Sequence, residues 1–361
     1  MKKVALISSG DCVHTLKWCN GLSEVGIDVT LITQQKPLPG FLTDVKIIEL
    51  PFSGAKGYFL NVFFLSKYLK EHKFDAINVH YVSGYGTLAR LSGIKNHIAS
   101  VWGADVYDFP KKSWFHHWLV EKNLNSASVI CSTSEVMGKH VQDTFQLKGG
   151  LEVEITPFGI NCEVFKKMQR EKQCKNLRIG TVKTLRPKYG IDLLIKSFSI
   201  LTKQYDNITL DIAGIGYQLD ELKKLTRELG IEDKVNFLGW VPNEEVPSIL
   251  NSFDIYVAPS TLDSESFGVA IIEASSCEIP VVVSDVGGLP EVVINKRTGL
   301  VVERNNIESI TNAIQFLLDN PEERQKMGKN GRQNVLDKYQ WNKCVEKMIN
   351  IYVANGILKN D

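Results

Sequence analysis

Short runs of apolar, often β-branched residues alternate with longer segments of helical periodicity along almost the whole chain. Most of the runs are apolar throughout, as in parallel strands that helices cover on both faces. The segments between them, such as 14–25 and 197–204, have the spacing of amphipathic helices. This alternation predicts doubly wound α/β layers. The predicted strands are residues 4–8, 28–33, 76–80, 98–102, 129–132, 153–156, 177–182, 209–213, 235–238, 255–258, 280–284 and 299–302.

The pattern is interrupted near residues 162–176, where cationic and amide side chains show no period before a new strand begins at Leu177. A chain of 361 residues is longer than one hydrophobic core usually serves. We therefore predict two Rossmann-like domains facing a central cleft, the first over 1–165 and the second over 175–340. Doubly wound sheets bind ligands beyond the carboxyl ends of their strands, so the loops there are the candidate sites.

Composition narrows the function classes. Hydrophobic residues make up 43% and charged residues 23%, which excludes a disordered or fibrous chain. The net charge of +1 lacks the basic excess of a dedicated nucleic-acid binder. The apolar start at Val4–Ile7 is too short for a secretory signal, and no apolar stretch is long enough for a spanning helix. The seven cysteines form no Cys-x-x-Cys pair, as expected for reduced thiols in a cytoplasmic protein without zinc.

The strongest candidate segment is residues 259–274, where a polar loop separates a strand from a helix predicted to start near Phe267. Backbone N–H groups at the start of a helix lack intrahelical acceptors and attract anions. Gly268 allows a ligand to approach that backbone closely. Glu265 in the loop and Glu273 in the helix could hydrogen-bond a sugar and a ribose, with a diphosphate between them. The alternative is a capped helix with a solvated carboxylate.

Two further strand-to-helix loops belong to the same domain. Gly287 and Gly288 follow a strand, where their amides could converge on a negatively charged group, although an ordinary glycine-rich turn explains the pair equally well. Lys183 and Lys188 follow another strand and could neutralise a departing diphosphate. We favour these lysines over Arg186, and surface cations held only by water are the alternative.

A Gly-x-Gly sequence at Gly214 and Gly216 invites a dinucleotide-binding interpretation. The third glycine is missing and no acidic ribose partner follows at the required distance, so this signal is weak. Trp240 follows a later strand, and we expect it to pack in the protein rather than stack on a base.

In this order, the motifs resemble glycosyltransferase family 4, the retaining nucleotide-sugar transferases of GT-B fold. The resemblance covers essentially the whole chain and is most specific from Gly180 to Val302. It implies that Glu265 contacts the donor sugar and that Glu273 holds the ribose. The remaining matched positions are the phosphate-facing helix start, the basic pair on the diphosphate and the Gly-Gly-x-Pro-Glu loop: Phe267, Gly268, Val269, Lys183, Lys188, Gly287 and Gly288.

The resemblance is weaker in the first half, which it makes the acceptor side. Gly10 ends the first strand in a loop that is less glycine-rich than in relatives. His14 opens the next helix and could touch the acceptor or a phosphate, with a structural role as the alternative. Trp102 replaces the family's usual His, so no His-assisted step carries over. Asp105 could bind hydroxyl groups or cap a turn. The final helix, within 341–361, resembles the family's closing element that packs back on the first domain.

The resemblance implies a hexosyltransferase that moves a sugar from a nucleoside diphosphate to a glycan or lipid-linked acceptor, in surface polysaccharide synthesis. UDP is the first expectation for the base, and GDP remains open. No cofactor or metal is expected, and no Asp-x-Asp triplet occurs. Two alternatives remain open: a nucleotide-sugar epimerase of the same fold, and a non-catalytic nucleotide-sugar binder. An NAD oxidoreductase fits less well.

Segments 58–73 and 111–119 mix cations with large aromatic side chains. They could touch the inner face of a membrane where a lipid-linked acceptor resides, giving a cytoplasmic, peripheral protein. The alternative is two ordinary amphipathic helices whose aromatic residues lie in the core.

Overall fold

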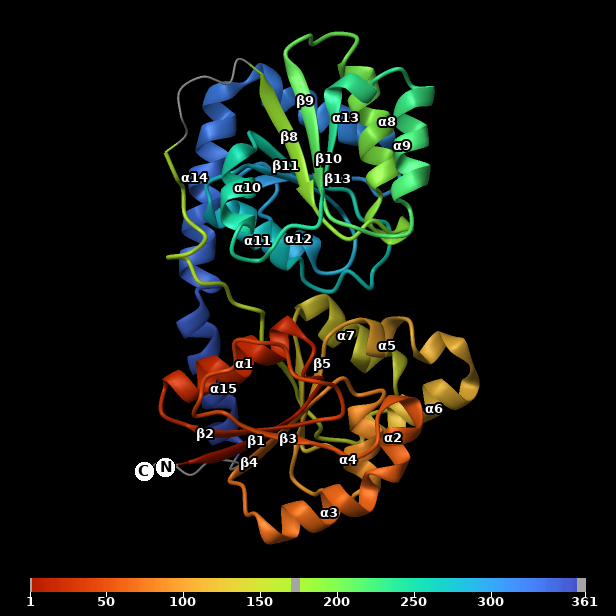
Figure 1. Cartoon of the computed structure of the whole chain (residues 1–361), viewed down its shortest axis with the longest axis vertical. Helices are drawn as coiled ribbons and strands as arrows, with labels where there is room; N and C mark the ends of the chain where they lie inside the picture. Colours follow the sequence, from red (N-terminus) through yellow and green to blue (C-terminus); the bar gives the residue numbers. More distant parts are fainter. Residues whose placement is uncertain (1, 170–175, 356–361) are drawn as a thin grey trace. The chain divides into compact units, whose positions relative to one another are not determined.

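The computed structural model describes residues 2–169 and 176–355, which form two compact units (Figure 1). The first unit contains the chain up to Phe158 together with the segment from Trp341 onward, and the second contains Gly159–Gln340. The division between units therefore falls before residue 165, where the sequence places the end of the first domain. Residues 170–175, inside the predicted boundary segment, lie outside the described residues, as do 356–361 of the predicted closing segment.

The first unit is built on a seven-stranded parallel sheet in the order β3-β2-β1-β4-β5-β6-β7. The apolar runs of the sequence form its buried central strands, because helices cover both faces of such a strand, and the strand at 76–80 also buries Asn78 and His80. The strands are β1 Lys3–Ile7, β2 Asp28–Thr33, β3 Lys46–Glu49, β4 Ala76–His80, β5 Ile98–Val101, β6 Val129–Ser132 and β7 Val153–Ile155.

Helices cover this sheet, and the last of them comes from the far end of the chain. In α15, Met348 and Tyr352 pack with Trp18 and Leu22 of α1, and the Tyr352 hydroxyl accepts a 3.0 Å hydrogen bond from Asn78 Nδ2. The closing helix thus completes the core of the first unit. The helices are α1 Val13–Glu24, α2 Gly54–Leu60, α3 Val62–Glu71, α4 Tyr85–Leu91, α5 Ala104–Tyr107, α6 Trp114–Leu124, α7 Glu135–Thr144 and α15 Trp341–Ala354, with a 3₁₀ turn, η1, at Pro110–Lys112.

The second unit contains a six-stranded parallel sheet in the order β10-β9-β8-β11-β12-β13. Its strands are β8 Leu177–Val182, β9 Ile208–Ala213, β10 Val235–Gly239, β11 Ile255–Ala258, β12 Val281–Ser284 and β13 Gly299–Val302. Its helices are α8 Ile191–Leu201, α9 Leu219–Glu228, α10 Val246–Ser252, α11 Val269–Ser276, α12 Leu289–Val292, α13 Ile307–Asp319 and α14 Pro321–Lys338, with 3₁₀ turns η2 Pro187–Tyr189 and η3 Glu232–Lys234.

In each sheet the strand order reverses once, between β1 and β4 in the first unit and between β8 and β11 in the second. At such a switch point the two following connections leave in opposite directions and open a crevice beyond the strand ends. The loops after β8 and β11 contain Lys183 and Glu265, which the sequence singles out. Among the described residues, no helix combines the length and apolar character that crossing a bilayer requires.

Candidate active site

Two predicted site residues form an ion pair at the switch point of the second unit. Lys183 follows β8 directly, and its Nζ lies 2.6 Å from Oε1 of Glu265 in the loop after β11. The two side chains are only 11% and 10% exposed. Strands β8 and β11 are neighbours, with Ile179 opposite Ile255, so their carboxyl ends bring together residues that lie 82 positions apart.

The site keeps Lys183 charged despite its burial. Desolvation alone would lower the pKa of Lys183, but the Glu265 carboxylate, followed by Tyr256 and Tyr189, outweighs this effect and raises the pKa above its ordinary value. Burial raises the pKa of Tyr256 to about 12, partly opposed by Lys183. A permanent cation beside a nearly buried carboxylate is a suitable surface for a ligand that carries both phosphate and hydroxyl groups.

The second predicted lysine joins the first through a shared aromatic ring. Lys183 Nζ lies 4.9 Å and Lys188 Nζ 5.0 Å from the centre of the Tyr189 ring. The backbone N–H of Thr261 donates to the Lys188 carbonyl at 2.8 Å, which ties this turn to the loop after β11. Gly190, at φ +63°, lies so close to the Pro259 carbonyl that a Cβ atom would be 2.1 Å from its oxygen. The structure thus brings together the basic pair that the sequence predicts.

Helix α11 begins two residues later than predicted, at Val269, with Gly268 as its N-cap at φ +93°. A Cβ atom at Gly268 would lie 2.8 Å from side-chain atoms of Ile271 and Leu289, so both backbone conformation and packing require glycine. The ring of Phe267 is buried against Tyr339, which leaves its backbone rather than its side chain at the helix start. Glu273 is half-buried in the second turn of α11.

The two glycines of the loop after β12 act differently from the sequence-based prediction. The Gly287 N–H donates to Asp263 Oδ1 at 3.1 Å, and the Gly288 N–H donates to the Glu265 carbonyl at 3.1 Å. These amides therefore donate hydrogen bonds within the protein instead of pointing at a site for a phosphate. A Cβ atom at Gly288 would lie 2.1 Å from the Ser266 carbonyl oxygen. The glycine pair allows its loop to pack directly on the loop that carries Glu265.

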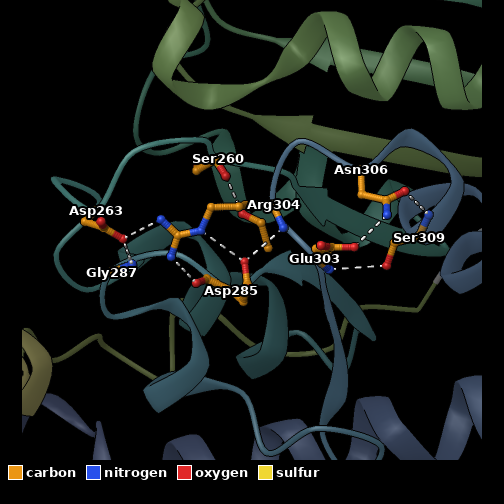
Figure 2. Close-up of polar contacts among 9 residues, drawn as sticks. Ser260, Asp263, Asp285, Gly287, Glu303, Arg304, Asn306 and Ser309 are labelled. Atoms are coloured by element: carbon orange, nitrogen blue, oxygen red, sulfur yellow. Dashed lines mark hydrogen bonds and ion pairs between the residues drawn. The ribbon is translucent and has the colours of Figure 1, made fainter.

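An arginine that the sequence analysis does not single out connects three loops at this edge of the sheet (Figure 2). Arg304, after β13, places Nη1 3.0 Å from Asp263 Oδ1 and donates through Nη2 to the Asp285 carbonyl at 2.7 Å. Its backbone N–H donates to Asp285 Oδ1 at 2.9 Å. Each of the three residues follows a strand of the sheet, and this position is the sequence signal that could have identified them.

The Gly-x-Gly sequence after β9 has a structural explanation. A Cβ atom at Gly214 would lie 1.9 Å from the Lys183 carbonyl oxygen, and one at Gly216 would lie 2.1 Å from that of Leu185. Backbone of the Lys183 loop therefore lies where a side chain would be, and the two glycines allow the loop after β9 to pack directly on it. The prediction that Trp240 packs in the protein is wrong, because this side chain is 68% exposed.

In the first unit, Asp105 holds two loops together. Its Oδ1 accepts hydrogen bonds from the N–H groups of Trp102 at 3.1 Å and Gly103 at 2.9 Å, and its Oδ2 accepts one from Val82 at 3.0 Å. Burial raises the pKa of Asp105, against the effect of these donors. Of the two roles that the sequence leaves open, this geometry favours the turn cap.

The ring of His14 lies in an aromatic cluster at the carboxyl edge of the first sheet. It stacks on Phe158, with centroids 4.1 Å apart, and meets Trp102 edge-on at 5.8 Å. Burial, followed by Lys17, lowers the pKa of His14 to about 4, so the ring is neutral at neutral pH and offers no positive charge to a phosphate. Gly10 donates its N–H to Thr33 Oγ1 at 2.8 Å and packs against residues 35–37.

Other chemistry at the site is limited. Within residues 2–169 and 176–355, no three His, Cys, Asp or Glu side chains gather as ligands for a metal ion. Ser264, next to Glu265, has a buried hydroxyl group with no protein partner in the described part of the chain. This hydroxyl adds a polar group to the loop that carries Glu265.

Comparisons with known proteins agree with this geometry. Residues 165–334 match the family model of glycosyl transferases group 1, and residues 3–134 match that of glycosyl transferase 4-like proteins. The chain is 30% identical over 273 residues to a GDP-mannose-dependent alpha-(1-6)-phosphatidylinositol monomannoside mannosyltransferase of Mycolicibacterium smegmatis, which covers 71% of this chain and 69% of that protein.

Solved structures share the whole fold at low sequence identity. Sucrose-phosphate synthase from Thermosynechococcus elongatus superposes with a TM-score of 0.85 at 20% identity over 98% of both chains. HepE of Anabaena, solved in complex with UDP, gives 0.83 at 17% identity over 98% of this chain and 100% of that one. The GT-B fold predicted from the sequence is therefore confirmed.

Proposed function

This chain belongs to the group 1 glycosyltransferases, family 4, and on that premise we propose that it transfers a sugar from a nucleoside diphosphate to an acceptor hydroxyl with retained configuration. The observation that carries the proposal is the Lys183–Glu265 pair at the switch point of the second sheet, with Lys188 on the same Tyr189 ring. Two ammonium groups and a carboxylate, held together by two loops, match a diphosphate bound to a sugar.

Each matched residue has a role in this reaction. Lys183 and Lys188 would stabilise the negative charge that develops when the bond between the anomeric carbon and the diphosphate oxygen breaks. Glu265 would hydrogen-bond the sugar, and Glu273 the ribose. The N–H groups of Gly268 and Val269 at the start of α11 would face phosphate oxygens. The acceptor oxygen would bond to the anomeric carbon on the face that the leaving group vacates, and its proton would pass to the diphosphate.

We propose GDP-mannose as the first donor to test. The mycobacterial relative is named for its dependence on GDP-mannose and is 30% identical to this chain. The UDP complex of HepE is a match at 17% identity, which supports the fold alone. This choice departs from the sequence-based expectation of UDP. UDP-sugars therefore remain in the panel.

We further propose that the reaction needs no metal ion or cofactor. Lys183 and Lys188 supply positive charge where a divalent cation would otherwise neutralise the diphosphate. The acceptor would be a glycan or lipid-linked glycan of a surface polysaccharide. Exposed aromatic side chains on α3 and α6, such as Phe63 (87% exposed) and Trp114 (80%), support a peripheral membrane contact of the first unit.

The first experiment is nucleotide release from a panel of GDP- and UDP-sugars, in the presence and absence of EDTA. We expect release from one donor to survive EDTA and to fall by about 10²-fold or more in Glu265→Ala. Glu308→Ala, which removes an exposed carboxylate from α13 of the same unit, is the matched control. Binding of no donor would refute the assigned site. A changed sugar still attached to its nucleotide would indicate an epimerase, and binding without turnover a binding protein.

A further inference from the structure

A polar cavity of about 510 Å³ lies at the amino edge of the first sheet. Its walls come from the segments that precede three neighbouring strands: the end of α4 before β5, the end of α6 before β6, and residues 146–148 before β7. Because the three strands run parallel, these segments meet at one edge, opposite the edge with Gly10, His14 and Asp105. The cavity is therefore separate from the residues that the sequence assigns to the acceptor side.

Two buried asparagines fix the walls of this cavity. Asn125 Nδ2 donates to the Gln146 carbonyl at 2.8 Å, and Asn125 Oδ1 accepts from the Lys148 N–H at 2.7 Å, which ties the end of α6 to the segment before β7. Asn123 Oδ1 accepts a 2.8 Å hydrogen bond from Arg90 Nε, which ties α6 to α4. Hydrogen bonds within the protein therefore shape the cavity.

Arg90 presents a half-buried positive charge to the cavity. Its Nε is held by Asn123, and neither Nη group forms a hydrogen bond or ion pair with any residue that the structure describes. Burial lowers the pKa of Arg90, and no carboxylate opposes this effect. Since a guanidinium remains charged at neutral pH, an anion in the cavity would supply the partner that the protein does not.

Two lysines add to this charge. Lys148 Nζ donates to the Asn125 carbonyl at 2.8 Å, and Lys122 Nζ lies 3.9 Å from Oε1 of Glu121. Glu121 is the one carboxylate among the described residues that line the cavity. Three cations against one carboxylate leave a net positive charge, so the cavity favours an acidic ligand.

The size and the remaining polar groups of the cavity indicate more than a simple anion. A lone phosphate or carboxylate would fill only a small part of about 510 Å³. Ser126 Oγ donates to the Asn123 carbonyl at 2.7 Å, so its oxygen is available as an acceptor. The Glu121 carboxylate is placed by the Gln146 N–H, which donates to Oε2 at 3.2 Å, and it offers further acceptor positions. The hydroxyl groups of a sugar ring match such acceptors.

We infer that this cavity binds an anionic sugar, with its phosphate or carboxylate at Arg90 and its hydroxyl groups at Glu121 and Ser126. The sugar bound here would take no part in the transfer, because the cavity lies at the amino edge of the sheet. The inference therefore goes beyond the proposed function and does not depend on it. An uncompensated guanidinium, an excess of cations and a carboxylate placed for hydroxyl groups are three separate observations that agree on this ligand.

Calorimetry with glucose 6-phosphate, glucuronate, glucose and inorganic phosphate tests the cavity. We expect one of the two anionic sugars to bind about 10-fold or more tightly than either glucose or phosphate. Arg90→Gln should weaken that binding by about 10-fold or more, because it removes the charge-assisted contact. Lys122→Gln should weaken it about 3-fold, since this side chain is 48% exposed. Lys139→Gln, on an exposed position of α7 that does not line the cavity, should leave it unchanged.

Two further variants test the hydroxyl contacts and the location. Glu121→Gln removes a negative charge, so it should tighten phosphate binding while the advantage of the anionic sugar over phosphate falls about 5-fold. Lys188→Gln alters the candidate active site of the second unit and should leave binding of the anionic sugar unchanged. Urea midpoints show whether each variant folds, and Lys122→Gln and Glu121→Gln decide if Arg90→Gln does not. Equal affinity for the anionic sugars and phosphate, or an equal loss in Lys188→Gln or Lys139→Gln, would overturn the inference.

Discussion

The ion pair between Lys183 and Glu265 combines a structural and a chemical role in two side chains. Both are nearly buried, so each charge depends on the other for compensation. A diphosphate or sugar that enters the site would exchange part of this internal contact for contacts of its own. The pair thus keeps the candidate site charged and ordered in the absence of a ligand.

Removal of either partner should therefore destabilise the protein. We expect Glu265→Gln and Lys183→Met each to lower the free energy of unfolding by about 3 kcal/mol, because each leaves a buried charge uncompensated. The double variant should lose clearly less than the sum of the two. Urea unfolding of the four proteins completes the cycle, and additive losses would mean that the two charges are independently solvated.

Asp105 provides a second test at the level of one residue. Asp105→Asn keeps the Oδ1 contacts but places an NH₂ group against the Val82 N–H, so we expect a loss of about 2 kcal/mol in unfolding free energy. Asp108→Asn changes an exposed carboxylate on the same segment and should have little effect. If Asp105→Asn retains full stability yet loses transfer to the acceptor, the residue binds substrate instead of capping the turn.

At the level of elements, the site depends on loops that hold one another. Glycines at 190, 214, 216, 287 and 288 each lie where a Cβ atom would meet a carbonyl oxygen of a neighbouring loop. Arg304 adds polar contacts between the loops after β11, β12 and β13. The loops of the candidate site are therefore packed as one layer on the carboxyl edge of the sheet.

Gly288→Ala tests this packing. The added methyl group would displace the backbone at Ser266, next to Glu265, so we expect nucleotide affinity to fall about 10-fold or more. Gly149→Ala is the matched control, because a Cβ atom there meets nothing within 4 Å. Affinity is measured by titration with GDP and UDP, and an unchanged affinity in Gly288→Ala would show that the two loops move independently.

Arg304→Gln tests the polar contacts. The ion pairs are about half exposed, so the free energy of unfolding should change by less than about 1 kcal/mol. The loop with Glu265 should become less ordered, and KM for the donor should rise several-fold while kcat changes less. Arg297→Gln, an exposed arginine before β13, is the control. An equal KM shift in both variants would attribute the effect to net charge.

Pattern alone was sufficient to predict most strands. Six predicted runs, including 28–33 and 177–182, coincide with β2, β4, β6, β8, β11 and β13, because a parallel strand covered on both faces is mostly apolar. Strand β3 at Lys46–Glu49 escaped prediction since it is a short edge strand with polar ends and partly exposed side chains. The sequence pattern therefore reports burial, and it weakens where a strand is only half covered.

The site was predictable where one loop carries its own signal, as with Glu265 and Lys183. It was less predictable where the role depends on a neighbouring loop. No local pattern shows that the Gly288 amide meets the Glu265 carbonyl, or that Arg304 reaches Asp263, since these contacts are set by strand order. Strand order is a property of the whole sheet, which no single loop reports.

Across the first unit, buried neutral histidines should make the fold sensitive to acid. Burial lowers the pKa of His14 to about 4 and that of His80 to about 3, with Lys17 and His14 as the second causes. In the unfolded chain both titrate near 6.5, so the unfolded state binds more protons below that pH. The contribution of these histidines to the free energy of unfolding should be fully present above pH 6.5. It should decline towards pH 4 by about 1.4 kcal/mol per pH unit for each histidine.

Tryptophan fluorescence reports mainly on the first unit, because Trp240 is the one tryptophan of the sequence that falls within 159–340. It can therefore follow this decline. Urea midpoints between pH 7.5 and 4.5 should fall in the wild type and fall less steeply in His80→Asn, which removes one of the groups that must stay neutral. His72→Gln replaces an exposed histidine on the same unit and should keep the wild-type slope. If His80→Asn also keeps that slope, the acid sensitivity arises from other groups of the unit, such as His97, whose pKa burial lowers to about 4, and the aromatic cluster around Trp102 tolerates a charged imidazole.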